Sequence, residues 1–228
     1  MDRKEAIDAF AKKTMPELAN GLSDKFGGLK ILTITKLGSS PYKADKEVLA
    51  QIEALTKSSN KKVKAAAINY LVKNGDAKYK AIFEAAVSDS SYRVAGAALK
   101  GLAALDNDNA YTLAKKYSDD AKGALGAAVN DIMLKSGTEA DFDLVSKMYN
   151  DAPLSQEKVQ ATSKYASFIA KVNDISKVKK GIDNIVAFRN AIPAEFRSFV
   201  DASFKKSLAV VSVAKGSEIE AYIADAFK

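Results

Sequence analysis

The sequence contains no histidine, no cysteine and no tryptophan, and only four prolines and twelve glycines among its 228 residues. Without histidine and cysteine, the chain lacks the ligands of most zinc sites, and it can form no histidine-based catalytic triad. We therefore expect no catalytic residue, no metal site and no cofactor in this chain itself. The lack of cysteine leaves the redox compartment open, whereas the few prolines and glycines argue against disorder and against a turn-rich β fold.

Long apolar runs are also absent. No stretch approaches the roughly 18 apolar residues of a membrane-spanning helix. The N-terminal "MDRKEAIDAF" carries charges with no apolar run behind them, so it is not a signal peptide. It is typical of a helix that begins at the first residues of the sequence. Both a natural start and a segment cut from a longer protein would give this pattern. We expect a soluble protein of unknown compartment with no membrane partner.

The basic charge is carried almost entirely by lysine. The net charge is +7, yet only four of the 35 basic residues are arginines, and bidentate recognition of phosphates and base edges favours arginine. An acidic segment over residues 119–152 also interrupts the basic charge. Lysines spread over solvated helix faces account for this pattern, so nucleic acid is a disfavoured partner.

Four segments of the chain align without gaps. They are "DKFGGLKILTITKL" (24–37), "SSNKKVKAAAINYL" (58–71), "DSSYRVAGAALKGL" (89–102) and "DDAKGALGAAVNDI" (119–132). The sixth, ninth, eleventh and fourteenth positions are apolar in every copy, and at about 100° per residue they cover more of a helix than a one-sided surface stripe does. The pattern predicts helices that are packed on more than one side.

Each copy carries its own start and stop signals. The first residues, Asp24, Ser58, Asp89 and Asp119, have side chains that can cap a helix N-terminus. A polar or glycine-bearing break follows each first helix, and a second apolar-periodic segment follows the break. The unit is a helix, a turn and a helix in about 30–34 residues, and such units stack into a solenoid because none can bury its apolar faces alone.

The flanking residues extend this pattern. Residues 1–23 look like a preceding pair, "RKEAIDAFAKK" and "MPELANGLS", and residues 153–228 form longer, more aromatic helices suited to capping the end. We predict an all-α fold, an α-solenoid of stacked antiparallel helix pairs with about 12–14 helices. Residues 1–228 should form a single domain with regular repeats over about 1–152.

One acidic cluster has the oxygen content of a metal site. "TEADFD" places Glu139, Asp141 and Asp143 close together, and carboxylate oxygens are the ligands of calcium and magnesium. The cluster lacks the glycine and the terminal glutamate of a calcium loop. It falls at a helix start, where acidic side chains interact favourably with the macrodipole, and we interpret it in that way.

Four surface residues are candidates for binding: Tyr92, Arg93, Arg189 and Arg197. Tyr92 and Arg93 can be read as a pair that grips a ligand. Their place at the start of a repeat helix favours a second interpretation, in which the Tyr92 ring packs at a junction between repeats and Arg93 stays solvated. In the same stretch, small residues such as Gly96 should let neighbouring helices approach closely.

The alternation of small and aliphatic residues resembles HEAT-like repeats, and the fold would then be a HEAT/armadillo-like superhelix. More narrowly, "DRKEAIDAF", "LSDKFGGLKILTITKLG", "DSSYRVAGAALKGLAALD" and "AIPAEFRSF" resemble the C-terminal helical domain of aminopeptidase N-like zinc metallopeptidases. The resemblance implies a non-catalytic domain, excised from a longer chain, that covers the active-site chamber and shapes the access of peptide substrates.

The implied partners are the N-terminal catalytic domain of the same polypeptide, which would hold the zinc, and the peptide substrate. None of the zinc-binding residues of that family has a counterpart here, because the chain contains no histidine. Two other interpretations stay open. A free-standing HEAT-repeat scaffold that binds a protein or peptide would have the same sequence features, and a basic HEAT-like module that binds nucleic acid would fit the charge.

Overall fold

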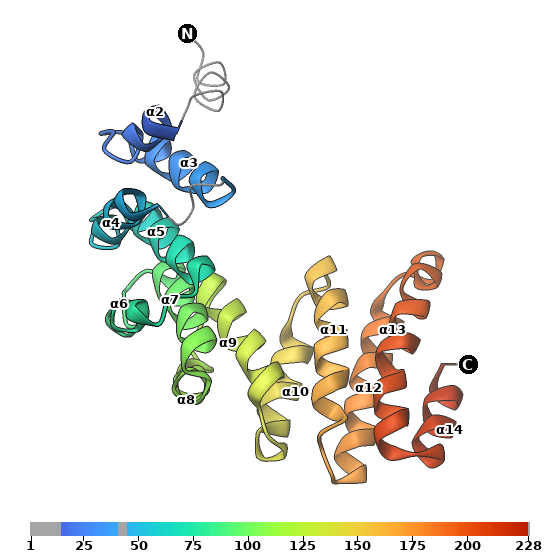
Figure 1. The fold of residues 1–228 in the computed structure, drawn as a ribbon. Helices are drawn as coiled ribbons and strands as arrows, with labels where there is room; N and C mark the ends of the chain where they lie inside the picture. The colour runs from blue at the N-terminus through green and yellow to red at the C-terminus, as the bar shows by residue number, and fades with distance from the viewer. Residues whose placement is uncertain (1–14, 41–44, 228) are drawn as a thin grey trace. The chain divides into compact units, whose positions relative to one another are not determined.

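The computed structural model describes residues 15–40 and 45–227, and every regular element within them is a helix (Figure 1). This described part holds thirteen α-helices, two short 3-10 helices and no strand. The all-α solenoid prediction is confirmed. The first half of the predicted preceding pair, "RKEAIDAFAKK", lies outside the described residues, and its second half contains α2 (Met15–Asn20). No helix in this part of the chain combines the length and apolarity needed to cross a bilayer.

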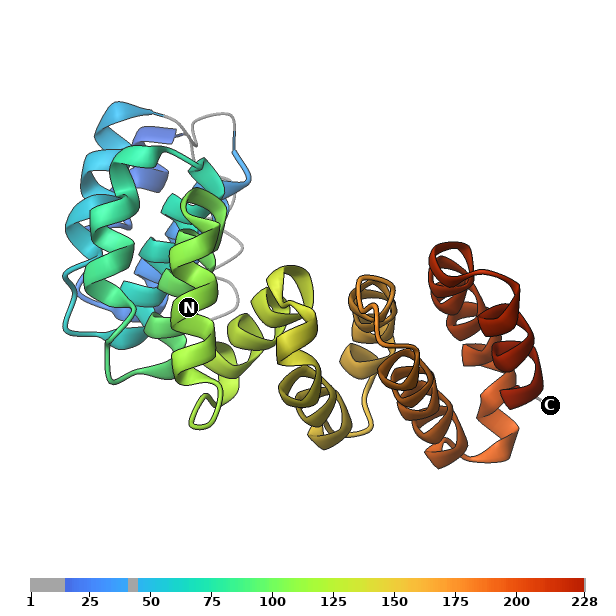
Figure 2. The same ribbon diagram turned by 90° about the horizontal axis from the view of Figure 1, so that it is seen from below.

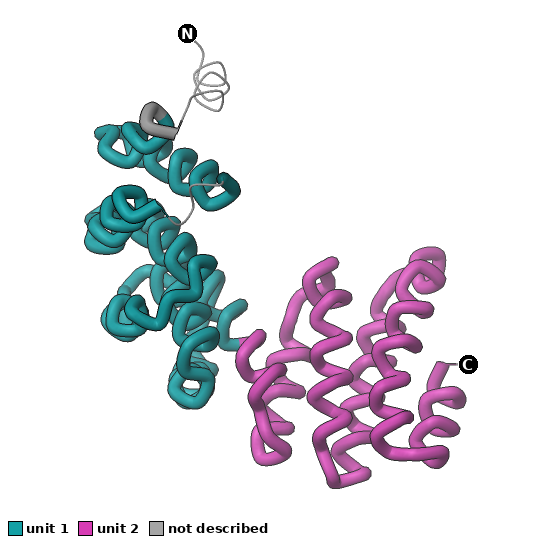
Figure 3. Tube along the Cα trace, in the orientation of Figure 1, with its two compact units in different colours: residues 1–129 teal, residues 130–228 magenta. Residues whose placement is uncertain are grey.

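Contacts divide the chain into two compact units, residues 1–129 (unit 1) and 130–228 (unit 2) (Figure 3). The division falls inside α9 (Gly123–Ser136). It lies earlier in the chain than the predicted end of the regular repeats near residue 152, and the single-domain organisation stays a prediction.

Unit 1 is built around a layer of three neighbouring helices, α3 (Gly27–Gly38), α5 (Lys61–Asn74) and α7 (Tyr92–Leu105). In this layer α5 packs between α3 and α7 (Figures 1 and 2). The second helix of each pair packs against the layer. These second helices are α4 (Lys46–Leu55), α6 (Lys80–Ala86), which follows the 3-10 turn Ala77–Tyr79, and α8 (Asn107–Tyr117).

The helices of this layer start later than predicted. In three copies, the side chain of the first residue accepts a hydrogen bond from the backbone N–H two residues later. The pairs are Asp24 with Phe26 (2.6 Å), Ser58 with Asn60 (3.2 Å) and Asp89 with Ser91 (2.9 Å). The N-cap is the second member of each pair, so the predicted caps are wrong by two positions. The first residue instead closes a local side-chain turn that leads the chain into the helix.

The eleventh and fourteenth positions of the repeat are buried in all four copies, as predicted. The eleventh is occupied by Ile34, Ile68, Leu99 and Val129, and the fourteenth by Leu37, Leu71, Leu102 and Ile132. In the fourth copy, however, Ala124 and Ala127 at the sixth and ninth positions are exposed, and Leu125 and Ala128 are buried instead.

The fourth copy is shifted by one residue at its start because α9 begins at Gly123, the fifth position of the repeat, whereas the three earlier helices begin at the fourth. Gly123 has a φ of +53°, a left-handed conformation that glycine adopts without strain. The gap-free register is therefore wrong for the first half of this copy.

Small residues in α7 allow close helix contacts. A Cβ atom added to Gly96 would lie 2.4 Å from the carbonyl oxygen of Ala124, in the first turn of α9, and one added to Gly101 would lie 2.6 Å from the ring of Phe83. Both distances are shorter than any ordinary van der Waals contact. The prediction that these positions are small to let neighbours approach is confirmed.

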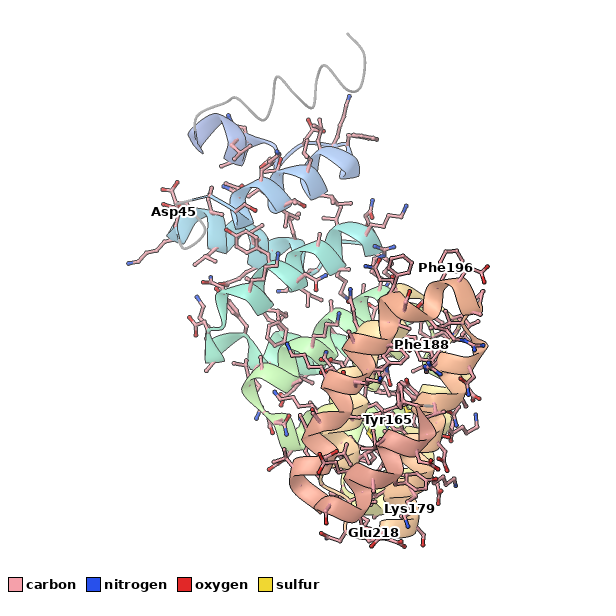
Figure 4. All side chains as sticks on the ribbon, turned by 90° about the vertical axis from the view of Figure 1, so that its right-hand side faces the viewer. Asp45, Tyr165, Lys179, Phe188, Phe196 and Glu218 are labelled. Carbon is pink, nitrogen blue, oxygen red and sulfur yellow. The ribbon has the colours of Figure 1, made fainter. Side chains whose placement is uncertain are left out.

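Unit 2 contains the two longest helices of the described residues, α12 (Ile175–Ala191) and α13 (Ala194–Lys215), in the same alternating arrangement. The 3-10 turn Glu139–Asp141 leads into α10 (Phe142–Asp151), followed by α11 (Gln156–Ile169), α12, α13 and α14 (Ser217–Ala226). Helix α11 packs against α13, and α12 packs against both α10 and α14. An ion pair between Lys179 and Glu218 (2.9 Å) also joins α12 to α14 (Figure 4).

Aromatic rings fill the core of unit 2. Tyr149 and Tyr165 are stacked with their ring centroids 4.1 Å apart, and the rings of Phe188 and Phe204 lie 5.4 Å apart. Tyr165 and Phe188 lie inside the unit (Figure 4). The two tyrosine hydroxyls are satisfied in the core, because that of Tyr165 is bonded to Ser146 and that of Tyr149 to another buried hydroxyl, each at 2.8 Å. This pairing lets polar groups remain buried at little cost.

Candidate functional site

The layer of unit 1 has an unusual charge distribution. Helices α3, α5 and α7 contain eight lysine or arginine residues and no aspartate or glutamate. Five aspartates of unit 1 lie in the turns, where they accept backbone N–H groups at helix starts. They are Asp24, Asp45, Asp76, Asp89 and Asp106. The helix surfaces of the layer are therefore basic, although the sequence around them contains acidic residues.

Two of these cations are neutralised within the protein. Lys61 and Lys64 on α5 form ion pairs of 2.9 and 2.7 Å with Asp89, whose side chain is only 6% exposed. Burial alone would raise the pKa of Asp89. The bonds from Lys64, from the backbone N–H of Ser91 and from Lys61 outweigh it and hold this pKa well below its ordinary value. The ionised carboxylate therefore connects α5 to the turn before α7.

Four other cations are exposed and lie on one side of the layer. Lys62 and Lys73 belong to α5, and Arg93 and Lys100 belong to α7. Their spacings of eleven and seven residues each return to the same side of a helix within about 20°. Lys62 and Arg93 occupy the fifth position of their copies, so the two helices present the same side. None of the four is paired with a carboxylate among the residues that the structure describes. We call Lys62, Lys73, Arg93 and Lys100 the basic face.

A groove between α3 and α5 reaches the basic face, because Lys73 belongs to both. Its volume is about 200 Å³, and its lining combines apolar side chains with polar ones. The lining residues are Ile34, Thr35, Gly38, Ala66, Asn69, Tyr70 and Lys73. Burial, together with the nearby Tyr79 and Asp45, raises the pKa of Tyr70 to about 12, so this ring forms a neutral wall at physiological pH.

The polar groups at the rim of the groove are exposed. Thr35 on α3 and Asn69 on α5 both occupy the twelfth position of the repeat and both reach solvent. The amide of Asn69 can donate and accept hydrogen bonds. The site therefore offers attraction for anionic groups, an amide for polar recognition and a partly apolar groove with room for a side chain.

The structure separates the predicted binding residues into two groups. Arg93 is exposed and belongs to the basic face, in agreement with its predicted solvation. Tyr92 is 46% exposed, so the prediction that its ring packs at a junction between repeats is wrong. It is the first residue of α7, about 100° around the helix from Arg93, and the close contact of α7 with α9 is made further along, at Gly96.

Arg189 and Arg197 serve the connection between α12 and α13. Arg189 binds both carboxylate oxygens of Asp201, at 2.6 and 2.8 Å. Arg197 donates to the carbonyl oxygens of Ile192 (2.9 Å) and Asn190 (2.8 Å) at the end of α12. Both guanidinium groups are therefore hydrogen-bonded to partners within unit 2, and they stabilise the connection between α12 and α13.

The acidic residues of "TEADFD" point to different partners. Each carboxylate is used where the chain enters or flanks a helix. Asp141 accepts from the N–H and hydroxyl of Thr138 (2.9 and 3.0 Å), Glu139 accepts from the N–H groups of Asn173 and Asp174 (2.9 and 3.1 Å), and Asp143 pairs with Lys180 (3.2 Å). Among the described residues, no three carboxylate, cysteine or histidine side chains form a group that could hold a metal ion.

Lys158 is the one buried lysine among the described residues, and it stabilises the end of α10. Its ammonium group donates to the carbonyl oxygens of Asn150 (3.1 Å) and Ala152 (2.9 Å) at the end of α10, and burial lowers its pKa.

The basic face is the strongest candidate site in unit 1. Of its four residues, sequence reasoning identified only Arg93.

The fold and this site define an α-helical repeat protein, a solenoid of stacked helix pairs with a basic surface on one layer. The family model for HEAT repeats matches residues 15–103, a range that includes α3, α5 and most of α7. The predicted HEAT-like repeats are thus confirmed over this range, whereas the aminopeptidase N-like parent stays a prediction.

Comparison with solved structures found a designed armadillo repeat protein that is 13% identical in sequence. The match covers 94% of this chain and 98% of the designed protein, with a TM-score of 0.40. No curated protein matches the sequence.

Proposed function

We propose that this chain is a partner-binding helical repeat scaffold, and that its basic face binds an anionic partner. The observation that carries the proposal is the set of four exposed cations, Lys62, Lys73, Arg93 and Lys100, on two neighbouring helices that contain no carboxylate. Solvated lysines of an ordinary helix surface are interspersed with acidic residues, as they are on α4 and α8.

The spacing of these charges supports a combined action. Packed helices lie about 8–10 Å apart, which is close to the Debye length of about 8 Å at physiological ionic strength. Neighbouring cations of α5 and α7 therefore act together on an approaching anion, whereas cations further apart are screened from one another. Such a field raises the association rate of an anionic partner and makes its binding sensitive to salt.

The test uses immobilised heparin as a general anionic probe. The face variant replaces Lys62, Lys73, Arg93 and Lys100 with glutamine, and it should elute at a lower NaCl concentration than the wild-type protein. The control variant removes the same charge from exposed lysines outside the basic face, through Lys46→Gln, Lys57→Gln, Lys116→Gln and Lys122→Gln. Equal elution of the two variants would show that only net charge matters and would contradict the proposal.

We propose, as a second candidate, that the chain is the C-terminal helical domain of a zinc aminopeptidase. The support is the resemblance of four sequence segments described above, and stacked helix pairs suit such a domain. The parent's catalytic domain would then hold zinc and would be a partner within the same polypeptide. An HExxH-containing segment in the reading frame upstream of Met1 is expected, and an unrelated upstream domain or a native start at Met1 would rule this candidate out.

A further inference from the structure

We infer that the partner of the basic face is an acidic segment of a protein in an extended conformation, with an apolar side chain among its carboxylates. The apolar side chain would enter the groove between α3 and α5, and the carboxylates would pair with Lys62, Lys73, Arg93 and Lys100. The inference rests on the proposed function, because it names the partner class for the same surface.

The groove favours a protein over a nucleic acid. At about 200 Å³ it is smaller than the roughly 300–1,000 Å³ of a pocket for a small molecule, but it has room for a side chain. Ile34, Ala66 and the ring of Tyr70 provide apolar walls. A phosphodiester backbone has no apolar group to place there, whereas a peptide can place a leucine or valine next to its acidic residues.

The polar groups of the surface also match a peptide. Asn69 lies on α5 between Lys62 and Lys73 and is exposed, and its amide can bond both the N–H and the C=O of an extended backbone. Three of the four cations are lysines, whereas base-edge recognition favours arginine. Tyr70, the aromatic residue of the groove, is only 5% exposed, so the groove offers no open ring face on which a base could stack.

The spacing of the cations fits an extended chain. A polyproline II segment repeats every three residues with a rise of about 3.1 Å each, so acidic side chains three residues apart lie about 9 Å apart. This distance matches the roughly 8–10 Å between packed helices. Along α5, Lys62 and Lys73 are separated by about 16 Å of helix. A segment of about six to nine residues would therefore reach from the groove to the cations of α7.

Two peptides of equal charge test the inference. Both are labelled with fluorescein and have twelve residues, one with the repeat Leu-Pro-Glu and the other with the repeat Ser-Pro-Glu, and binding is followed by fluorescence anisotropy at low salt. A 20-base-pair DNA duplex is the third probe. We expect the leucine peptide to bind about tenfold more tightly than the serine peptide, because burial of one leucine side chain contributes at least that factor. We also expect it to bind more tightly than the duplex.

A variant that fills the groove separates the two parts of the surface. A Cβ atom at Gly38 would meet the ring of Tyr70 at an ordinary 3.5 Å, so the longer side chain of Gly38→Leu should extend into the groove. This variant should lose the tenfold preference for leucine and keep its affinity for the serine peptide. If circular dichroism shows that Gly38→Leu is unfolded, Thr35→Phe blocks the same groove from an exposed position on its rim and keeps the amide of Asn69.

The outcomes distinguish failure of the inference from failure of the proposed function. Equal affinity for the two peptides, or tighter binding of the duplex that the face variant abolishes, would overturn the acidic-segment inference and leave the anionic-partner proposal standing. No binding of any probe, or binding that the face variant and the control variant reduce equally, would overturn both.

Discussion

At the scale of single residues, Asp89 shows how a carboxylate can organise two helices. It accepts from the ammonium groups of Lys61 and Lys64 on α5 and from the backbone N–H of Ser91, the N-cap of α7. Each bond to a charged group contributes about 1.5–3 kcal/mol, more than a neutral bond does. Asp89 therefore fixes the start of α7 against the previous repeat, in addition to closing the turn that all three copies share.

The substitution Asp89→Asn tests this assignment. The asparagine keeps the turn bond to Ser91 but loses the charge, so we expect a loss of about 2 kcal/mol in the free energy of unfolding at pH 7. The pKa of Asp89 is lower in the folded protein than its ordinary value of 3.8. Its contribution is therefore complete above about pH 4 and is lost as the pH falls toward the folded-state pKa.

Urea denaturation of the wild-type protein and the variant at pH 7 and at lower pH measures this difference, which should shrink on acidification. Asp24→Asn is the matched control, because Asp24 makes the same turn bond, to Phe26, and no ion pair with any residue that the structure describes. Equal stability of wild type and Asp89→Asn at pH 7 would show that the two ion pairs contribute nothing.

Single residues also mark where sequence reasoning fails. The place of Tyr92 at the start of a repeat helix predicts a packed ring, but its orientation depends on where α7 meets α9, which no local pattern encodes. Asp24, Ser58 and Asp89 were identified as helix-start residues, although a side chain of this kind can accept from the N–H of its own turn as well as from the first turn of a helix. The sequence predicts that these residues mark helix starts. It does not predict that each helix is capped two residues later.

At the scale of helices, small residues decide which elements touch. Gly96→Ala adds a single methyl group that would lie 2.4 Å from the backbone of α9 at Ala124, and backbone cannot move aside as a flexible side chain can. We expect a loss of about 2 kcal/mol in unfolding free energy, although alanine favours an isolated helix over glycine by about 1 kcal/mol. Thermal and urea denaturation measure the change.

The control for this prediction is Gly38→Ala. Its added Cβ atom would meet the Tyr70 ring at 3.5 Å, so we expect almost no change in stability. If Gly96→Ala were as stable as Gly38→Ala, the approach of α7 to α9 would be looser than the structure describes.

The length of a helix was easier to predict than its register. The sequence accounts for both ends of α12 (Ile175–Ala191), because Asp174 caps the start and Pro193 follows closely after the end. In α9 the pattern predicted the eleventh and fourteenth positions and failed at the sixth and ninth. Gly123 delays that helix by one residue through its positive φ, and a lone glycine in the sequence does not say which backbone conformation it adopts.

At the scale of the whole molecule, stability should be distributed by unit. In a repeat array, each element depends mainly on its neighbours. Phe204→Ala removes a fully buried ring from unit 2, and Phe83→Ala removes a nearly fully buried one from unit 1. Each substitution should cost about 3–5 kcal/mol locally.

Hydrogen exchange measured by mass spectrometry tests this expectation. Phe204→Ala should reduce protection in α11, α12, α13 and α14 more than in α3, α5 and α7, and Phe83→Ala should do the reverse. Uniform loss of protection along the chain in both variants would show that the two units unfold as one.

Adding charges along the sequence shows that residues 58–118 are basic, but it does not locate the basic face within them. Summed over residues 58–118, the lysines of α5 and α7 are partly cancelled by Asp76, Asp89 and Asp106. Turn chemistry places these aspartates at helix starts, so their charges sit at the ends of helices and those of the lysines lie along their sides. Lys62 and Arg93 occupy the same position of the repeat, and both are exposed in the structure. The two observations together show that they lie on the same side of the layer.

The basic face also has a chemical property that follows from its composition. Three of its four cations are lysines, and acetylation of a lysine removes its charge. Arg93 is not a substrate for that reaction, so a fully acetylated face would keep a single positive charge. The same amines that attract an anionic partner are therefore points at which a covalent mark would release it, whereas a surface built from arginines would keep its charge under the same treatment.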